Sequence, residues 1–282
     1  MKRILSGILF WAVGTAASAT HLQPAVDKLI NQVDPNINMG IVVVDLNTGE
    51  TLYQRNASRA FVPASNMKLF SDAAALMALG PDYRFQSKLS TDATKLEQGV
   101  LKGSVYLYLP GDPSLTQANL DSLLSQLARL GVTRIQGNVV LVSNNSGVNA
   151  YAPGRMAEDL KYSYGAPVAP VVLDENRLTV TVNPAYRAGQ PAFVELNDLN
   201  SSLMLNNQVN TSNKTKGCGI DFNMDNENHL TVRGCVGLGQ WAVQQRIAIR
   251  NPLRYTQDLV RSHLASLNIH LDGAVTLGHS PR

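Results

Sequence analysis

The segment Ser65–Leu79 restricts the fold of this chain more than any other. It follows Pro63, stops at Gly80-Pro81 and places apolar side chains on nearly all sides of the helix that it predicts. A helix of this kind is stable when other elements cover every face, so we expect it to be a buried central helix. The fold must therefore contain further layers around it.

The residues before this helix predict the first of those layers. Met39–Leu46 is an apolar, β-branched run and indicates a largely buried strand. Asn47–Glu50 has the composition of a turn, and Thr51–Gln54 is the expected hairpin partner of the strand. A further helix is expected over Ala25–Val33.

The N-terminus predicts the compartment. Lys2 and Arg3 precede the apolar run Ile4–Val13, and small residues then lead to Ala17-Ser18-Ala19. We interpret residues 1–19 as a secretory signal that is cleaved after Ala19. A membrane anchor is the alternative, but the run is shorter than the roughly 20 residues that a spanning helix needs. We therefore expect an exported, periplasmic protein with no transmembrane segment.

Charge and cysteine content narrow the function. Loss of the signal lowers the formal net charge from +3 to about +1, which does not favour binding to nucleic acid. Cys218 and Cys235 are the two cysteines, and an oxidising compartment favours a disulfide that closes a loop of roughly 18 residues. A zinc site is the alternative, but His229 is the nearby histidine and no CxxC spacing exists, so we expect no metal.

The first turn of the apolar helix holds a candidate catalytic pair. In Ser65-Asn66-Met67-Lys68 the i,i+3 spacing puts a hydroxyl and an amine on one helix face. A serine hydroxyl is a poor nucleophile until a base takes its proton, and a lysine acts as that base when desolvation and nearby positive charge lower its pKa. Backbone N–H groups at the same helix end can stabilise an oxyanion.

An ordinary N-cap at Ser65 is the alternative, and the bare S-x-x-K pattern is weak by itself. A capping box wants Glu or Gln three residues after the serine, and the helix dipole disfavours a cation in the first turn. Lys68 breaks both preferences. Because such rules are broken most often at functional sites, the pattern favours nucleophilic catalysis.

Several segments together resemble a known family. Asp45–Tyr53 followed by Phe61–Lys68 resembles the opening of the fold shared by penicillin-binding proteins and class A β-lactamases. Further segments resemble the D-alanyl-D-alanine carboxypeptidase/endopeptidase family of the penicillin-binding-protein-4 type, namely Leu79–Phe85, Leu101–Leu107, Gly111–Thr116 and Leu130–Asn138. The resemblance covers nearly all of the chain after the signal.

The resemblance implies a multi-domain α/β protein. Residues 20–82 would begin a penicillin-binding-protein/β-lactamase-like peptidase domain, residues 83–244 would be a large, mainly-β insertion, and residues 245–282 would return to a peptidase domain that is incomplete at its C-terminus. Periodicity within the later segments predicts three elements, which are a helix over Gln117–Leu130, a strand over Gln245–Ile249 and an amphipathic helix over Leu253–Leu267.

The resemblance also implies substrate-binding residues in the insertion. In Asp159–Pro167, Asp159 would hold the free amine of the diamino acid in a stem peptide, and Tyr164 would line the cleft. A carboxylate at a cleft mouth suits an ammonium group. The alternative is that Asp159 caps or solubilises a loop.

Two later motifs of the family are not convincingly present. Ser143-Asn144-Asn145 lies in the insertion and Ser266-Leu267-Asn268 ends a helix, so neither is a persuasive S-x-N element. Lys214-Thr215-Lys216-Gly217 has one residue too many for K-T-G and adjoins a cysteine. The chain stops at Arg282, where the family would continue through the rest of its sheet.

By the resemblance, Ser65 attacks a D-alanyl carbonyl of a peptidoglycan peptide, forms an acyl-enzyme and is inhibited by β-lactams, with no cofactor. The alternative is a noncatalytic relative that binds peptidoglycan or a partner protein; the absent motifs favour it, and the intact Ser65 and Lys68 pair speaks against it. A β-lactamase is disfavoured because the long insertion is a feature of the peptidases.

Overall fold

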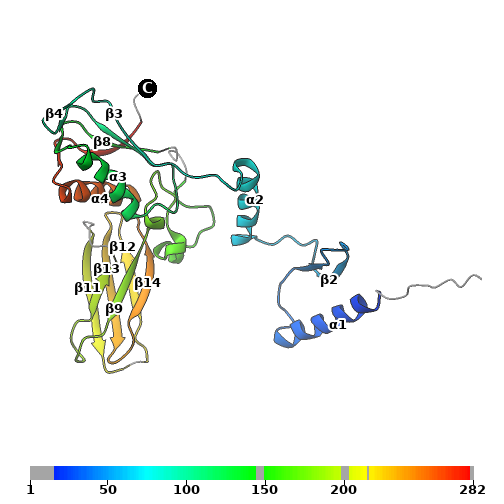
Figure 1. The fold of residues 1–282 in the computed structure, drawn as a ribbon. Helices are drawn as coiled ribbons and strands as arrows, with labels where there is room; N and C mark the ends of the chain where they lie inside the picture. Colours follow the sequence, from blue (N-terminus) through cyan, green and yellow to red (C-terminus); the bar gives the residue numbers. More distant parts are fainter. Residues whose placement is uncertain (1–15, 144–148, 198–202, 215, 280–282) are drawn as a thin grey trace, which may run out of the picture. The chain divides into compact units, whose positions relative to one another are not determined.

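The computed structural model describes residues 16–143, 149–197, 203–214 and 216–279 (Figure 1). The predicted signal run Ile4–Val13 lies outside these ranges, as do Asn144, Asn145, Thr215 and Arg282. The chain divides into two compact units, Met1–Tyr83 and Arg84–Arg282. The second unit thus begins one residue after the start of the predicted insertion.

The first unit consists of short elements around a hairpin. They are α1 (Ala16–Val33), β1 (Ile41–Val44), β2 (Thr51–Arg55), a 3-10 turn η1 (Ala64–Asn66) and α2 (Met67–Leu79). β1 and β2 are antiparallel, with Val43 opposite Tyr53, so the predicted hairpin is confirmed. α2 ends at Gly80, whose φ of 79° is a backbone conformation that favours glycine.

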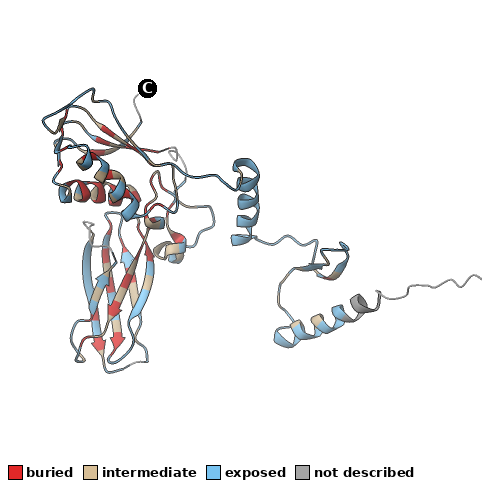
Figure 2. Ribbon diagram, in the orientation of Figure 1, coloured by how far each residue is buried: buried red, intermediate tan, exposed pale blue. Residues whose placement is uncertain are grey.

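The predicted burial of this unit is wrong. No residue of α2 is buried, and β1 has Val42, Val43 and Val44 exposed (Figure 2). Tyr53 alone is buried among the described side chains of the unit; its hydroxyl donates to Asp27 of α1 over 2.7 Å. A two-stranded hairpin and α1 do not supply the layers that an all-apolar helix needs, which is why its side chains remain open.

The second unit begins with two small sheets covered by helices. Their strand orders are β15-β7-β5-β4 and β16-β8-β6-β3. The strands are β3 (Lys88–Thr91), β4 (Leu96–Glu97), β5 (Val100–Leu101), β6 (Val105–Tyr108), β7 (Arg134–Ile135), β8 (Val139–Val142), β15 (His270–Leu271) and β16 (Val275–Gly278). β6 and β16 both run parallel to β8, which requires crossover connections.

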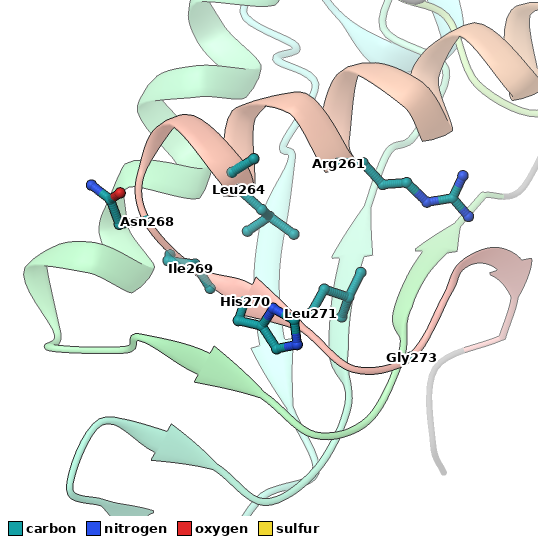
Figure 3. Close-up of a pocket in the computed structure, with 8 residues that line it drawn as sticks. Arg261, Leu264, Asn268, Ile269, His270, Leu271 and Gly273 are labelled. Carbon is teal, nitrogen blue, oxygen red and sulfur yellow. The ribbon is translucent and has the colours of Figure 1, made fainter.

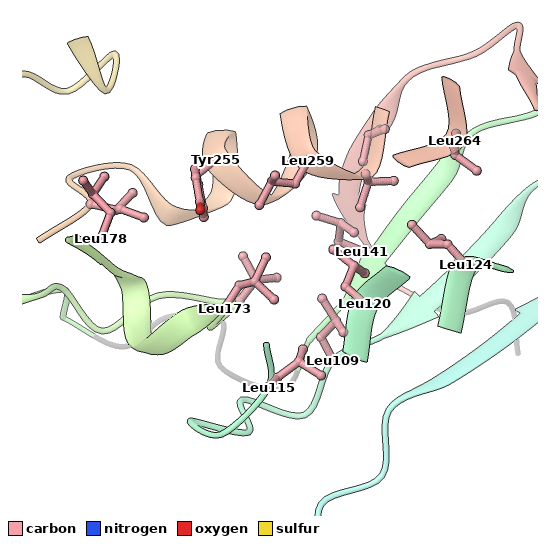
Figure 4. Close-up of a cluster of buried hydrophobic side chains, with 14 of the residues drawn as sticks. Leu109, Leu115, Leu120, Leu124, Leu141, Leu173, Leu178, Tyr255, Leu259 and Leu264 are labelled. Atoms are coloured by element: carbon pink, nitrogen blue, oxygen red, sulfur yellow. The ribbon is translucent and has the colours of Figure 1, made fainter. Parts of the chain in front are cut away.

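Helices α3 (Gln117–Arg129) and α4 (Pro252–Ser266) lie in these crossovers and match the predicted segments. α3 begins with a reciprocal cap between Thr116 and Asn119. Its buried face and that of α4 meet the sheet in one apolar cluster (Figure 4), which includes Leu109, Leu120, Leu124, Leu141, Leu259 and Leu264. This α/β layer is the main core of the unit.

Two three-stranded sheets form the rest of the unit, here called the β module. Their orders are β10-β9-β14 and β11-β13-β12. The strands are β9 (Arg177–Asn183), β10 (Phe193–Leu196), β11 (Met204–Ser212), β12 (Ile220–Met224), β13 (His229–Gly237) and β14 (Val243–Ala248). β9 buries Leu178, Val180 and Val182 in strict alternation, as expected of a strand with one covered face.

Residues 245–282, which were expected to return to the peptidase domain, lie in the second compact unit of this structure. β14 pairs with β9 of the β module, and α4 packs in the cluster with α3. Asn251, the cap of α4, exchanges two hydrogen bonds of 2.8 and 2.9 Å with Asn228 of the β module. Parallel pairing of β15 with β7 and of β16 with β8 then completes the sheets of the second unit, so these residues belong to that unit.

Within the ranges that the structure describes, no helix is both long and apolar enough to cross a membrane.

Candidate functional site

Ser65 and Lys68 are brought together at the start of α2. Ser65 lies in η1, Lys68 lies in the first turn of α2, and the Lys68 Nζ donates to the Ser65 Oγ over 3.1 Å. This is the distance of a direct proton transfer between a nucleophile and its base. Both residues are exposed.

Ser65 does not act as an N-cap. Pro63 and Asn66 occupy the cap positions of η1 and α2, and neither makes a side-chain capping hydrogen bond. The Ser65 hydroxyl oxygen instead accepts a hydrogen bond from the Lys68 amine. The structure therefore contradicts the alternative in which Ser65 is an ordinary N-cap.

Ala64 is strained, and nothing in the sequence points to this strain. Its φ of 45° lies in the left-handed region, which costs a residue with a Cβ about 1–2 kcal/mol. Such strain persists where the surroundings hold it, and it is concentrated at functional sites. Ala64 directly precedes Ser65, so the unusual backbone turns the chain into the position from which the hydroxyl meets Lys68.

Asp159 and Tyr164 form a second local arrangement, in the other unit. Asp159 lies in a 3-10 turn, Ala157–Lys161, and Tyr164 lies in the next, Ser163–Gly165. The Tyr164 hydroxyl donates to the Asp159 carboxylate over 2.9 Å, and this hydrogen bond raises the pKa of Tyr164 above its usual value. Tyr164 is 62% exposed and stacks on the ring of Tyr162.

The loop of Asp159 is anchored to the β module. The Lys161 Nζ lies 2.7 Å from the Asp221 carboxylate of β12, which also accepts from Arg233 of β13 over 2.8 Å. The hydrogen bond from Lys161 is the main cause that lowers the pKa of Asp221, and the same bond raises the pKa of Lys161. Nothing in the local sequence pointed to this triad, because its members are far apart along the chain.

Gly165 closes the same loop. A Cβ on this residue would overlap the carbonyl oxygen of Asp159, so the two 3-10 turns approach each other as closely as backbone allows. The guanidinium of Arg155 also donates to the Tyr164 carbonyl. Asp159, a half-buried residue, is therefore held in one place by its own loop, with its carboxylate beside the tyrosine hydroxyl.

The structure joins Cys218 and Cys235 in a disulfide with a Cα–Cα distance of 5.0 Å. It links the residues before β12 to β13, so it is placed to hold the sheet edge rather than to react.

The weak later motifs have structural roles. The Ser266 hydroxyl donates to the His263 carbonyl at the end of α4, and the Ser143 hydroxyl donates to the Pro170 carbonyl. The backbone N–H of Lys214 donates to the Ser212 hydroxyl in an exposed loop.

The second unit has several cavities, and the disulfide cysteines Cys218 and Cys235 line one of about 200 Å³. Another, of about 470 Å³, lies where α4 runs into β15 and is lined by Arg261, Asn268 and His270 among others (Figure 3). Among the described residues, no group of three or more His, Cys, Asp or Glu side chains is placed to hold a metal ion.

Comparison with known proteins identifies the family. The model of the D-Ala-D-Ala carboxypeptidase 3 (S13) family matches residues 22–282. D-alanyl-D-alanine carboxypeptidase DacB of Haemophilus influenzae is 25% identical over 260 residues, which is 91% of this chain and 54% of the relative. D-alanyl-D-alanine carboxypeptidase of Actinomadura sp. (strain R39) is 28% identical over 282 residues, 96% of this chain and 51% of the relative.

A solved structure confirms the expected type of fold. The crystal structure of penicillin binding protein 4 (dacB) from Haemophilus influenzae matches with a TM-score of 0.77 at 26% identity, over 91% of this chain and 57% of the other. The chain spans about half the length of the curated relatives that it matches. From the family match and this fold, the chain belongs to the D-Ala-D-Ala carboxypeptidase 3 (S13) family.

Proposed function

We propose that this chain supplies the nucleophile of a serine-type D-Ala-D-Ala carboxypeptidase/endopeptidase that acts on peptidoglycan stem peptides. The observation that carries the proposal is the 3.1 Å hydrogen bond between the Lys68 Nζ and the Ser65 Oγ in a member of the S13 family. The relatives named above are D-alanyl-D-alanine carboxypeptidases, which supports the same chemistry here.

The reaction follows from the pair. A neutral Lys68 takes the proton of the Ser65 hydroxyl as the oxygen attacks the D-alanyl carbonyl, and the Ser65–acyl ester forms as the peptide C–N bond breaks. The proton passes to the leaving nitrogen, which departs as free D-alanine. Water then attacks the ester, and Lys68 accepts its proton before returning one to Ser65.

Desolvation of Lys68 is the part that the described residues do not supply. Every residue from Phe61 to Leu79 is exposed, so the lysine amine faces water. A charged amine in water is a poor base. Efficient acylation therefore requires that other polypeptide or the bound substrate cover the start of α2.

Asp159 is proposed to bind the amine of the stem peptide. Its carboxylate is held by the Tyr164 hydroxyl over 2.9 Å, which keeps one oxygen engaged and leaves the group able to accept from an ammonium. Tyr164 presents an exposed ring beside it. The same hydrogen bond is also consistent with the alternative, in which Asp159 only closes its loop.

β-Lactams are proposed as inhibitors because a strained amide would take the place of the D-alanyl peptide bond. A second structure of the Haemophilus influenzae protein is a complex with a β-lactam. After attack by Ser65, the leaving nitrogen stays tethered and blocks water, so the ester persists.

A labelled penicillin tests the proposal. In protein that also contains the later S-x-N and K-T-G elements, we expect label on Ser65, none in Ser65→Ala, and acylation slowed by roughly 10²–10⁴-fold in Lys68→Ala, which keeps the hydroxyl but removes its base. Ser71→Ala is the matched control, because that hydroxyl donates to backbone carbonyls of α2. Label on another serine, or unchanged label in Ser65→Ala, contradicts the assignment.

A noncatalytic, binding role is the second candidate, and the exposure of α2 favours it. The helix that carries the nucleophile exposes apolar residues, and such residues are typical of a surface that another polypeptide covers. The two roles separate in the same experiment, since a binding module retains peptidoglycan but takes no label. In a chain of 282 residues we expect weak labelling or none, because the later S-x-N and K-T-G elements are not recognisable in it.

Export to the periplasm is proposed from the predicted signal over residues 1–19. Bacterial D-alanyl-D-alanine carboxypeptidases among the relatives support a cell-wall substrate, and such a substrate lies outside the cytoplasm.

A further inference from the structure

One end of the β module gathers exposed aromatic residues on three loops. These loops are residues 184–192, 211–214 with 216–219, and 237–242, here called the distal tip. They lie together because the Ala185 N–H donates to the Thr211 hydroxyl over 2.8 Å and the Leu238 N–H donates to the Ser212 carbonyl over 2.7 Å. The tip is the end of β13 away from the joint with α4 (Figure 1).

The apolar side chains of the tip project into solvent. Trp241 is 94% exposed and Tyr186 is 89% exposed, and Leu238 is also open. The Tyr186 ring rests edge-on against Phe193, with centroids 6.0 Å apart. Single exposed apolar residues are common, but a tryptophan and a tyrosine open on adjacent loops form a patch of the kind that marks an interaction surface.

Positive charge surrounds these side chains. Arg187, Lys214 and Lys216 are all exposed on the tip loops. The three loops contain no aspartate or glutamate, although the whole chain is nearly balanced in charge. A surface that combines projecting Trp, Tyr and Leu with unopposed cations complements an anionic partner that has an apolar interior.

We propose that the distal tip binds an anionic lipid surface. Trp and Tyr favour the membrane–water interface, where the ring is partly buried and the polar atom stays hydrated, and Lys and Arg pair with anionic headgroups. A glycan strand is the rival partner, since aromatic rings stack on sugars and its peptides have carboxylates. Leu238 favours lipid, because an exposed aliphatic side chain on the same loop as Trp241 gains from the acyl region.

The tip is built to present Trp241 without ordering a loop on binding. The Gln240 side chain accepts from the Gly237 N–H over 2.7 Å, which closes the turn between β13 and β14. The Cys218–Cys235 disulfide ties the second loop to β13. A preorganised loop loses less entropy on binding than a mobile one.

Intrinsic fluorescence provides a direct test, because Trp241 is the one tryptophan of a chain processed after Ala19; the other is Trp11. The processed chain is mixed with vesicles of phosphatidylglycerol and phosphatidylcholine in equal amounts, and with vesicles of phosphatidylcholine alone. We expect a blue shift and quenching by brominated acyl chains with the anionic vesicles, both weakened by salt.

Matched variants separate the two contributions. Each lysine or arginine near an anionic surface strengthens binding by about fivefold, so Arg187→Gln, Lys214→Gln and Lys216→Gln together lower the partition coefficient by about 100-fold. Lys88→Gln, Lys95→Gln and Arg129→Gln remove as many exposed cations from the α/β layer and leave it unchanged. The double variant Trp241→Ala, Tyr186→Ala tests the aromatic contribution, and its vesicle binding is measured by flotation. Leu130→Ala, which removes an exposed apolar side chain outside the tip, is its control.

Two outcomes overturn the proposal. One is equal vesicle binding by the tip and control variants. The other is binding to isolated peptidoglycan, lost in Trp241→Ala, with no fluorescence change on either type of vesicle; the tip is then a glycan site. Labelling of Ser65 by penicillin does not depend on either result, so the acylation test and this one fail separately.

Discussion

Hydrogen bonds to single side chains set the geometry of both predicted sites. The Ser65 hydroxyl accepts a hydrogen bond from the Lys68 amine, and the Asp159 carboxylate accepts one from the Tyr164 hydroxyl. In each case a residue with unusual backbone constraints lies next to the reactive group: Ala64 has a positive φ, and Gly165 has no room for a Cβ. The reactive groups are thus oriented by the backbone, which residue type alone does not reveal.

Gly165→Ala tests the constraint at Asp159. The added methyl group collides with the Asp159 carbonyl, so the two 3-10 turns must separate; we expect a loss of stability of about 1–3 kcal/mol. Urea unfolding measures it. Gly154→Ala is a poor control because its φ is 83°, whereas Ala166→Gly changes the adjacent position without a clash. A stability equal to that of the parent contradicts the close approach.

The Lys161–Asp221 ion pair predicts a pH dependence. Because Lys161 and Arg233 lower the pKa of Asp221, its contribution is present above the unfolded pKa near 3.8 and is lost as the pH falls through the lower, folded value. The raised pKa of Lys161 gives the opposite limit: its contribution is present below the unfolded value of 10.5 and is lost as the pH rises through the folded one. The stability difference between the parent and Asp221→Asn should therefore be largest between these limits in urea unfolding and shrink outside them. A difference that does not vary with pH contradicts the pairing.

At the scale of elements, the α/β layer depends on two helices that meet over one sheet. Leu120 and Leu124 of α3 and Leu259 of α4 are fully buried in a single cluster. α3 also connects β6 to β7 and β8, and α4 precedes β15 and β16. Packing of these helices is therefore what brings the end of the second unit against its beginning.

Leu124→Ala measures that packing. The substitution leaves a cavity among α3, α4 and the sheet, and we expect a loss of about 2–5 kcal/mol in urea unfolding. Leu130→Ala, at a position 70% exposed at the end of the same helix, should change stability by less than about 0.5 kcal/mol. Similar losses in the two variants would show that the cluster is not the core.

The disulfide is the covalent link between elements. Cys218 and Cys235 are 17 residues apart, and the chain-entropy estimate for a loop of this length is about 3 kcal/mol. We expect the double variant with both cysteines changed to Ala to unfold at correspondingly lower urea concentration, and mass mapping without reductant to recover the linked peptides. Two freely alkylated thiols in exported protein rule out the bridge.

Local sequence patterns predict individual helices and strands, but they do not predict which distant strands pair. The pattern of α3 and the turn between β1 and β2 are signals within a few residues. In contrast, the pairing of Val275 with Val139 and of Ile247 with Leu178 depends on partners far along the chain, so the sequence does not indicate that residues 245–282 join the second unit. Burial of α2 was also predicted from composition, which says what a helix needs and not whether neighbours supply it.

At the scale of the whole molecule, the surfaces of the two units differ in kind. In the first unit, apolar side chains of α2 such as Leu69 and Phe70 are open around the nucleophile. In the second, most large apolar side chains are buried in one continuous cluster; Tyr186, Leu238 and Trp241 are open at the distal tip, and others such as Leu96 and Leu130 are open elsewhere. The second unit is therefore the stable scaffold, and the first is the part whose chemistry depends on what covers it.

Processing of the N-terminus determines which form of the protein, cleaved or uncleaved, is the functional one. The Ala17-Ser18-Ala19 sequence follows the apolar run, so we expect the exported protein to begin at Thr20 and to lack Trp11. N-terminal sequencing and the intact mass of protein from the periplasm measure this. Ala19→Arg should block cleavage, because the site accepts small residues, whereas Ala25→Arg, beyond the site, should leave the new N-terminus unchanged. Retention of Met1 in protein that remains with the membrane fraction would instead make residues 4–13 an anchor; vesicle binding by the distal tip would then add to an attachment that the N-terminus already provides.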